Sequence, residues 1–307
     1  MILITGAGGF LGSALSRRLK ESGLDVVTTR RRDEFLLRED EWQCDLTRSD
    51  HVARLCQEAP RPVTVVHLAG HVEISLRPNP THPQLPPFPG DENVDRIYRG
   101  NLLTTASILQ FSRLAEVRHV VFASSQAVYG IPTSTVLTED SPCNPLEHYA
   151  ASKLCAERML ELEVRRGLPA VTVLRFPGLY AEDRRSGVVH EFCRSAVSSG
   201  VVSVRVAFPL PLDVIHRDDV VAAFETTVQH AGEGYQCFNI ATGESCSLDI
   251  LAESVAELVP GCKVQHSSIP QPVIQMSAQR AADVLGWRAV PRVRRLSLFI
   301  EEVKHAR

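Results

Sequence analysis

The segment YAASK (149–153) places a tyrosine and a lysine four residues apart, so Tyr149 and Lys153 share one face of a helix. A free tyrosine titrates near pH ~10 and exchanges protons at neutral pH only when a nearby cation stabilises its phenolate. Lys153 is placed to be that cation. Ser125, in the segment SSQAVYG (124–130), adds a hydroxyl directly after an apolar run. Together these residues predict an acid–base site that moves a proton on a hydroxyl or carbonyl group.

A glycine-rich segment, TGAGGFLG (5–12), stands between an apolar run and a helical pattern at the start of the chain. Leu11 breaks the spacing G-x-G-x-x-G, but Gly6, Gly9 and Gly12 satisfy G-x-x-G-x-x-G. Glycines allow a tight turn and let the backbone approach a pyrophosphate, which the free N–H groups of the following helix then bind. The segment predicts a dinucleotide site, and the alternative is a strand–helix turn with incidental glycines.

Three arginines follow the second apolar run, in the segment DVVTTRRRD (25–33). The end of this strand, at Arg30, is where a NAD-binding unit would place an acid that binds the adenosine ribose. A guanidinium there can bind a 2′-phosphate with two charge-assisted hydrogen bonds, whereas a carboxylate repels it. Arg30 therefore predicts a preference for NADP, with Arg31 flanking the adenine or sharing the phosphate. The alternative is a basic surface turn balanced by two acids that follow it, Asp33 and Glu34.

Apolar runs alternate with helical patterns through the first half of the chain. Strands are expected at 1–5, 25–29, 63–70, 119–125 and 170–176, and helices at 10–23, 50–59, 101–117 and 148–167. This alternation predicts βαβ units and a parallel sheet covered on both faces, with ligands at the carboxyl ends of the strands. The less regular second half predicts helices at 187–200 and 248–259, a strand leading into a helix at 212–230, and a strand at 236–241.

One segment, 77–90, carries six prolines and is expected to form neither a helix nor a central strand. A long loop of this kind is either a lid or substrate loop or a plain surface insertion.

Composition excludes several classes of function. The chain has 307 residues, of which 44% are hydrophobic and 22% charged, with a net charge of −3, so we expect neither nucleic acid nor a membrane surface as a partner. No signal peptide or membrane span is recognisable, and eight cysteines without a C-x-x-C pair predict reduced thiols in a cytoplasmic protein. His67 and His71 lack a third ligand in register, so no metal site is expected.

Further segments appear in a recognisable order: CDLT (44–47), VVHLAG (65–70), LRFPGLY (174–180), DVIHRDD (213–219), FNIATG (238–243) and VLGW (284–287). With the segments above, they resemble the extended short-chain dehydrogenase/reductases of the NAD(P)-dependent epimerase/dehydratase family, the type that modifies nucleotide sugars. The resemblance implies an α/β fold, with a Rossmann-type doubly wound parallel sheet and a smaller C-terminal α/β substrate domain. It assigns residues 1–174 and about 213–241 to the dinucleotide-binding domain, and 175–212 and 242–307 to the substrate domain. It also implies a homodimer formed through helices at 101–115 and 149–166.

The resemblance also implies roles for single residues. Tyr149 is the catalytic acid/base, Lys153 lowers its pKa and holds the nicotinamide ribose, and Ser125 hydrogen-bonds the reacting carbonyl or hydroxyl. Asn101 supports the active site. Contacts with the cofactor, NADP or NAD, are expected from Gly6, Gly9, Phe10, Leu11, Gly12, Arg30, Arg31, Asp45, Leu46, Leu68, Ala69, Gly70, Asn101, Tyr149, Lys153 and Phe176.

Departures from the family pattern bear on the substrate. Gln126 and Ala127 stand where family dehydratases have an Asp-Glu pair, which disfavours elimination of water. Gly178 and Leu212 replace an asparagine and an arginine that contact a nucleotide diphosphate in sugar-nucleotide epimerases. Other arginines can supply that charge, and the candidate substrate residues are Gln126, Gly178, Arg184 and Arg185.

The sequence therefore predicts an NAD(P)(H)-dependent oxidoreductase or epimerase that acts on a sugar, and the resemblance to the family implies that this sugar is nucleotide-linked. The arginine cluster favours a ketoreductase, which consumes NADPH. One alternative is an NAD-dependent nucleotide-sugar 4-epimerase, which regenerates its cofactor in each turnover. A second is a non-catalytic dinucleotide-binding protein.

Overall fold

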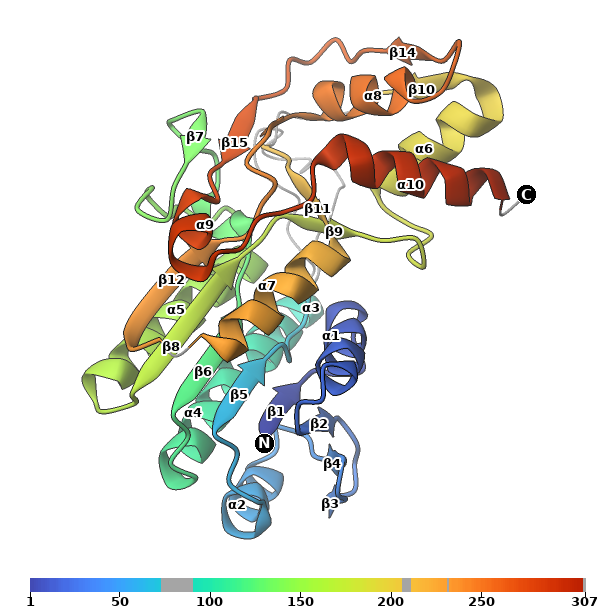
Figure 1. Cartoon of the computed structure of the whole chain (residues 1–307). Coiled ribbons are helices and arrows are strands. Elements are labelled where there is room, and N and C mark those ends of the chain that lie inside the picture. Colours follow the sequence, from blue (N-terminus) through green and yellow to red (C-terminus); the bar gives the residue numbers. More distant parts are fainter. Residues whose placement is uncertain (73–90, 206–210, 231, 306–307) are drawn as a thin grey trace.

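The computed structural model describes residues 1–72, 91–205, 211–230 and 232–305 (Figure 1). The proline-rich segment 77–90 lies outside the described residues. A central eight-stranded sheet has the order β12-β8-β6-β5-β1-β2-β4-β3, and every neighbouring pair is parallel except β3 with β4. Its strands are β1 (Ile2–Thr5), β2 (Val26–Arg30), β3 (Leu36–Leu37), β4 (Glu41–Gln43), β5 (Thr64–His67), β6 (His119–Ala123), β8 (Ala170–Arg175) and β12 (Gly234–Asn239).

Strand order reverses between β1 and β5. From β1 the chain first builds one side of the sheet through β2 and β4, and then returns to build the other side from β5 to β12. In open parallel sheets, ligands bind at the carboxyl ends of the strands where the strand order reverses. The glycine-rich segment follows β1, so it lies at this switch point.

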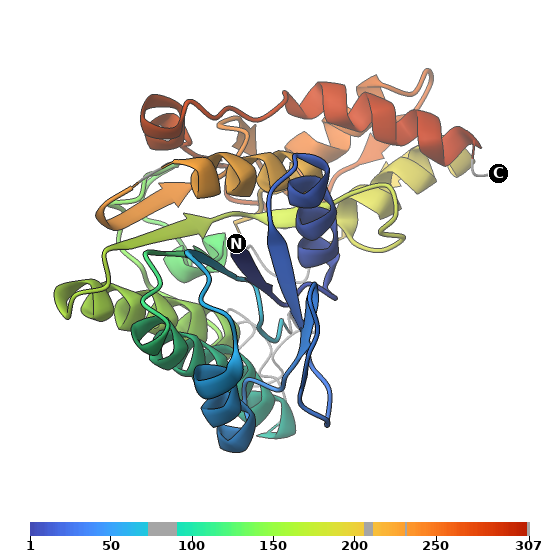
Figure 2. The same ribbon diagram turned by 60° about the horizontal axis from the view of Figure 1, so that its bottom comes forward.

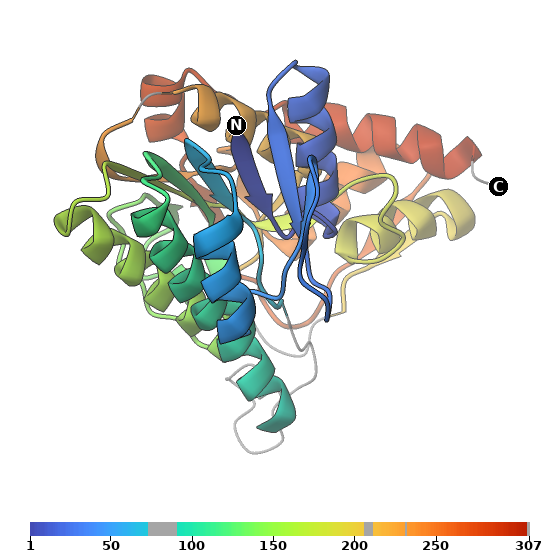
Figure 3. The same ribbon diagram turned by 90° about the horizontal axis from the view of Figure 1, so that it is seen from below.

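Two apolar layers cover the faces of the sheet. Leu3 packs in the cluster with α2, α4 and α5, whereas the next residue, Ile4, packs in the cluster with α1 and α7. Successive residues of a strand point to opposite faces of the sheet, and both side chains are fully buried because helices cover both faces. Figure 2 shows α1 and α7 side by side, and Figure 3 shows α2, α4 and α5 on the other side of the sheet. The helices are α1 (Phe10–Glu21), α2 (Ser49–Glu58), α4 (Thr104–Leu114), α5 (His148–Arg165) and α7 (Arg217–Gln229).

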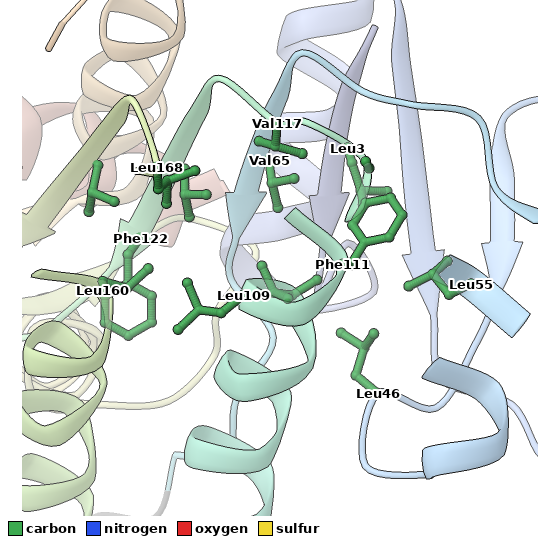
Figure 4. Packing of buried hydrophobic residues seen from close by; sticks show 14 of the residues in the cluster. Leu3, Leu46, Leu55, Val65, Leu109, Phe111, Val117, Phe122, Leu160 and Leu168 are labelled. Carbon is green, nitrogen blue, oxygen red and sulfur yellow. The ribbon is translucent and has the colours of Figure 1, made fainter. Parts of the chain in front are cut away.

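Helix α4 lies at the centre of its layer. Figure 4 shows its side chains Leu109 and Phe111 directed at the strands, with Leu160 of α5 on one side and Leu55 of α2 on the other. All four are at least nine-tenths buried, so this layer holds α5 firmly against the sheet.

The C-terminal part forms a third apolar cluster around Phe192, Leu251 and Phe299, at one end of the sheet (Figure 1). Its helices are α6 (Val188–Ser199), α8 (Leu248–Glu257) and α10 (Arg292–His305). Helix α9 (Gln279–Leu285) packs instead in the apolar cluster of Ile4, α1 and α7. Short strands form three small sheets, β10 (Val201–Ser203) with β14 (Lys263–Gln265), β9 (Gly178–Tyr180) with β11 (Val214–His216), and β13 (Ser245–Cys246) with β15 (Ile274–Met276) and β7 (Val136–Leu137).

The expected fold is confirmed, but several of its elements differ from the expectation. The helix expected at 101–117 is a π-helix, η1 (Arg99–Leu103), followed by α4, and it is preceded by α3 (Asp91–Tyr98). The strand expected at 63–70 ends at His67. Strands β3 and β4 were not expected, because two or three residues are too short to show a periodic pattern. Within the described ranges, no helix is long and apolar enough to cross a membrane.

Candidate active site

Tyr149, Lys153 and Ser125 meet at the carboxyl end of β6. Helix α5 begins at His148, so the tyrosine lies in its first turn and the lysine lies one turn later. The Lys153 side chain is buried, and its Nζ donates a hydrogen bond of 2.9 Å to the carbonyl of Ala123, the last residue of β6. The Ser125 side chain lies next to the Tyr149 phenol. The structure thus brings together the three residues that the sequence nominated for catalysis.

Burial shifts the two ionisable groups of this site in opposite directions. It raises the pKa of Tyr149 to about 12, although the Ser125 side chain acts against the shift. It lowers the pKa of Lys153 to about 8, and here the charge of Glu157 acts against the shift. At neutral pH the phenol is protonated and the lysine remains a cation. Ionising the phenol therefore requires positive charge nearby, and Lys153 is a cation one helical turn away.

Asn101 fixes the loop after β5. Its Oδ1 accepts a hydrogen bond from the backbone N–H of His71 at 2.7 Å, and its Nδ2 donates to the His71 carbonyl at 3.1 Å and to Ser152 Oγ at 2.8 Å. A Cβ added to Gly70 would lie 2.6 Å from Asn101 Oδ1 and 3.5 Å from Lys153 Nζ. Asn101 belongs to the π-helix, a feature that often marks functional sites. The asparagine therefore joins this loop to α5.

The glycine turn has the close backbone contacts that a pyrophosphate site needs. Gly6 has a φ of +71°, and a Cβ on it would lie 2.7 Å from the backbone nitrogen of Ala69. A Cβ on Gly12 would lie 2.3 Å from the Gly6 carbonyl oxygen, and one on Gly9 would lie 3.3 Å from the same atom. Helix α1 starts at Phe10 without a side-chain cap and without an acid in its first turn. Its first N–H groups therefore fit an anion, and the turn fits a dinucleotide.

Thr5 holds the loop of Leu68 and Ala69 against the glycine turn. Its Oγ1 accepts hydrogen bonds from the backbone of Leu68 at 3.2 Å and of Ala69 at 3.1 Å. The same oxygen lies 2.7 Å from His67 Nδ1, and His67 Nε2 lies 3.2 Å from Thr105 Oγ1. Burial lowers the pKa of His67 to about 3, so this histidine is a neutral core residue.

Arg30 ends β2 as expected, but its ionic partner lies on β4. Arg30 Nε is 2.9 Å from Glu41 Oε2, and the arginine side chain is 49% exposed. The carboxylate beside Arg30 is therefore Glu41 rather than one from the acids at 33 and 34. Arg31 is exposed next to it. The sequence missed Glu41 because β4 was not expected.

Hydrogen bonds fix the main chain at Asp45 and Leu46, the two residues expected to contact the adenine. The Asp45 carboxylate closes a turn, accepting from Thr47 N at 2.9 Å and from Thr47 Oγ1 at 2.7 Å. Leu46 is buried, and its carbonyl accepts a hydrogen bond of 2.7 Å from Ser107 Oγ on α4. The main chain at these two positions is therefore fixed between β4 and α4.

The candidate substrate residues lie on two segments that follow the sheet. Gln126 has a buried side chain, and its backbone N–H donates to the Phe176 carbonyl at 2.9 Å. Gly178 opens β9, and its N–H donates to the Asp213 carbonyl at 3.2 Å. The loop after β9 carries Arg184 and Arg185.

Arg184 and Arg185 are both exposed, but Arg184 also contacts the start of α1. The Arg184 guanidinium is 5.2 Å from the centre of the Phe10 ring, and that of Arg217 is 4.7 Å from it. Arg217 is held by Asp183, with Nη1 2.6 Å from Oδ2. The loop after β9 therefore contacts the start of α1, and it brings positive charge close to the pyrophosphate position.

The comparisons with known proteins agree with this geometry. The model of the NAD dependent epimerase/dehydratase family matches residues 2–82 and 89–241. The chain belongs to this family. It is similar to a UDP-glucose 4-epimerase of Mycolicibacterium smegmatis, with 29% identity covering 93% of this chain and 92% of the relative, and to one of Azospirillum brasilense, with 26% identity covering 96% and 88%. The solved structure of MoeE5 in complex with UDP-glucuronic acid and NAD is 28% identical, covers 100% and 99% of the two chains and has a TM-score of 0.75.

Membership of the epimerase/dehydratase family confirms two conclusions from the sequence. The chain is an NAD(P)-dependent enzyme of the short-chain dehydrogenase/reductase type, rather than a non-catalytic dinucleotide-binding protein. Its fold is the Rossmann-type sheet with a smaller C-terminal part that this family has.

In this member of the family the acid–base site rests on a buried polar network that the sequence did not reveal. Glu157, one turn after Lys153, binds Arg175 of β8 and Ser124 of the β6 end. The spacing of Glu157 from Lys153 was a visible signal, but its partners lie on other strands.

Proposed function

We propose that this enzyme is a 4-epimerase of a nucleotide-linked sugar. The observation that carries the proposal is the meeting of Tyr149, Ser125 and Lys153 beside the glycine turn, at a sheet edge where Gln126 and Ala127 follow the serine. These side chains can move a proton on a sugar hydroxyl, but they include no carboxyl pair to eliminate water. The names of the relatives support the epimerase over the ketoreductase that the arginine cluster favoured.

Each residue of the site has its own role in moving the proton. Tyr149 takes the proton of the sugar hydroxyl and later returns it, Ser125 hydrogen-bonds the same oxygen, and Lys153 stabilises the phenolate. A bound nicotinamide dinucleotide supplies the acceptor and donor of the hydride. In an epimerase the hydride returns to the opposite face of the sugar carbon, so no cofactor is consumed over a turnover.

We propose that the adenosine end prefers NADP, but only modestly. Arg30 supplies the positive charge for a 2′-phosphate, while Glu41 already neutralises part of that charge from one side. The NAD bound to MoeE5 supports a nicotinamide dinucleotide as the cofactor.

We propose that residues 175–212 and 242–307 form the substrate-binding domain. Gly178 replaces a family diphosphate contact, and Arg184 on the next loop lies close enough to the glycine turn to take that role. Support for a nucleotide-linked substrate also comes from the UDP-glucuronic acid bound to MoeE5.

We propose a homodimer formed by α4 and α5. Leu114 on α4 and Leu162 on α5 are 55% and 46% exposed, so apolar side chains are available on both helices for a partner. Light scattering during size-exclusion chromatography should give twice the chain mass, and a monomer would contradict the proposal.

The test of the function is product analysis with UDP-glucose and UDP-glucuronic acid. The purified enzyme should convert one of them into its 4-epimer without net change in NADH or NADPH absorbance. Stoichiometric oxidation of NADPH with a 4-keto sugar, and no epimer, would establish the ketoreductase instead.

A further inference from the structure

The carboxylate of Glu157 accepts three hydrogen bonds in the core. Two come from Arg175, from Nε at 3.0 Å and from Nη2 at 2.6 Å, and the third comes from the Ser124 hydroxyl. The side chains of Glu157 and Arg175 are 1% and 5% exposed. A buried ion pair of this kind contributes little net stability compared with an apolar pair, so its charges call for another explanation.

These bonds hold the end of β6 against α5. Lys153 Nζ binds the carbonyl of Ala123, and Glu157, one helical turn later, binds the side chain of Ser124. Ser125 is the next residue of the chain. Two successive residues before the catalytic serine are therefore fixed by the helix that carries Tyr149 and Lys153.

Arg175 extends the network to the neighbouring strands. Its Nη1 donates to the Tyr129 hydroxyl at 3.1 Å and to the Glu139 carbonyl at 3.2 Å. The Tyr129 hydroxyl donates in turn to Asn239 Oδ1 on β12 at 2.6 Å. The arginine is thereby fixed from several sides, and it holds the Glu157 carboxylate in one position.

Glu157 also acts on the charge of Lys153. Burial lowers the pKa of Lys153, and the negative charge of Glu157 opposes this shift. Arg175, the cation bound to Glu157, offsets part of that negative charge, and Tyr149 on the same helix and His67 on β5 are further ionisable groups near Lys153. Burial keeps both of them neutral at pH 7. Among the residues that the structure describes, Glu157 is thus the anion that acts on this lysine.

We propose that Glu157 is a positioning residue of the acid–base site. Its carboxylate anchors Ser124, and through it Ser125, and it supplies a negative charge that acts on the Lys153 ammonium. Arg175 holds the carboxylate in that place. The inference rests on the proposed function, because a charged Lys153 is what makes the Tyr149 proton transferable in the reaction.

Lysine NMR tests the charge on Lys153 without any substrate. The chain has only four lysines, Lys20, Lys153, Lys263 and Lys304, so ¹³Cε-lysine labelling gives four signals, and Lys153→Met assigns the relevant one. In Glu157→Gln the titration midpoint of Lys153 should fall by at least about one pH unit. The matched control is Glu163→Gln, also buried on α5 but paired with Arg113 at 3.3 Å, and it should leave the Lys153 midpoint unchanged.

A second variant keeps the test valid if Glu157→Gln does not fold. That change leaves the Arg175 charge buried without its partner, whereas Glu157→Gln with Arg175→Met removes both charges. Because the double variant also removes the Arg175 cation, its Lys153 midpoint is compared with that of Arg175→Met alone, which keeps the Glu157 carboxylate. Equal Lys153 midpoints in these two folded variants would overturn the electrostatic role. Absence of epimerase activity in the native chain would contradict only the proposed function, because the titration requires no turnover.

Ser124→Ala tests the anchoring role. It should lower kcat several-fold with little change in KM and leave the Lys153 midpoint unchanged, because the carboxylate keeps its bonds to Arg175. A native kcat in this variant would show that Ser124 does not position Ser125.

Discussion

The two ends of the dinucleotide site are built differently. At the nicotinamide end, Lys153 and Tyr149 are buried and tied to the sheet by α5. At the proposed adenosine end, Arg30 is half exposed and meets the carboxylate of Glu41. Charges in the dry interior interact strongly and are hardly screened, whereas exposed pairs contribute little. We therefore expect the first region to determine whether the chemistry occurs and the second to adjust which cofactor is preferred.

The largest effect is expected at the buried end. Tyr149→Phe removes the group that moves the proton and should lower kcat by roughly 10²–10⁴-fold, the usual contribution of general acid–base catalysis. Cofactor affinity, measured by calorimetry, should remain nearly native. A native kcat in this variant would contradict the role of Tyr149 as the acid/base.

A comparison within the glycine turn should give the next largest effect. A Cβ on Gly12 would lie 2.3 Å from the Gly6 carbonyl oxygen, whereas one on Gly8 would meet no atom within 4 Å. Gly12→Ala should therefore weaken dinucleotide binding by about 100-fold or more, since the turn must shift away from the pyrophosphate position. Gly8→Ala is the matched control and should bind with native affinity. Equal losses in both variants would show that the turn does not act through close contact.

The pH dependence should reveal Lys153. Burial lowers its pKa to about 8, so the ammonium is present below that pH and is lost above it. Turnover should fall by about tenfold per pH unit above this value, because a neutral lysine no longer stabilises the phenolate. A pH–rate profile of kcat/KM for the free enzyme is the measurement. A rate that stays constant up to pH 10 would contradict the assignment.

The smallest effect is expected at the exposed end. Arg30→Met should reduce the ratio of NADP to NAD affinity, and Glu41→Gln should raise it, each by roughly two- to fivefold as for surface charges. Added salt should diminish both changes because exposed charges are screened. Fluorescence titration with each dinucleotide measures the ratio. If both variants had the native ratio of NADP to NAD affinity, Arg30 and Glu41 would have no role in cofactor preference.

Local patterns accounted for most of the central sheet and its helices. Long apolar runs predicted β1, β5, β6 and β8 because strands buried on both faces have few other solutions. They failed for β4, whose three residues show no periodicity, and for the π-helix around Asn101, which has the same apolar spacing as an α-helix. Both failures concern residues beside the cofactor position.

By itself, the sequence determined what depends on near neighbours in the chain. Tyr149 and Lys153 share a face because four residues make about one helical turn, and Gly6, Gly9 and Gly12 form one turn between a strand and a helix. Only the tertiary structure decided the partners of these groups. Glu41 reaches Arg30 because β4 pairs with β2, and Arg175 reaches Glu157 because β8 lies beside β6 under α5. Such contacts depend on which elements pack together, and that order is set by burial of the whole core rather than by any short segment.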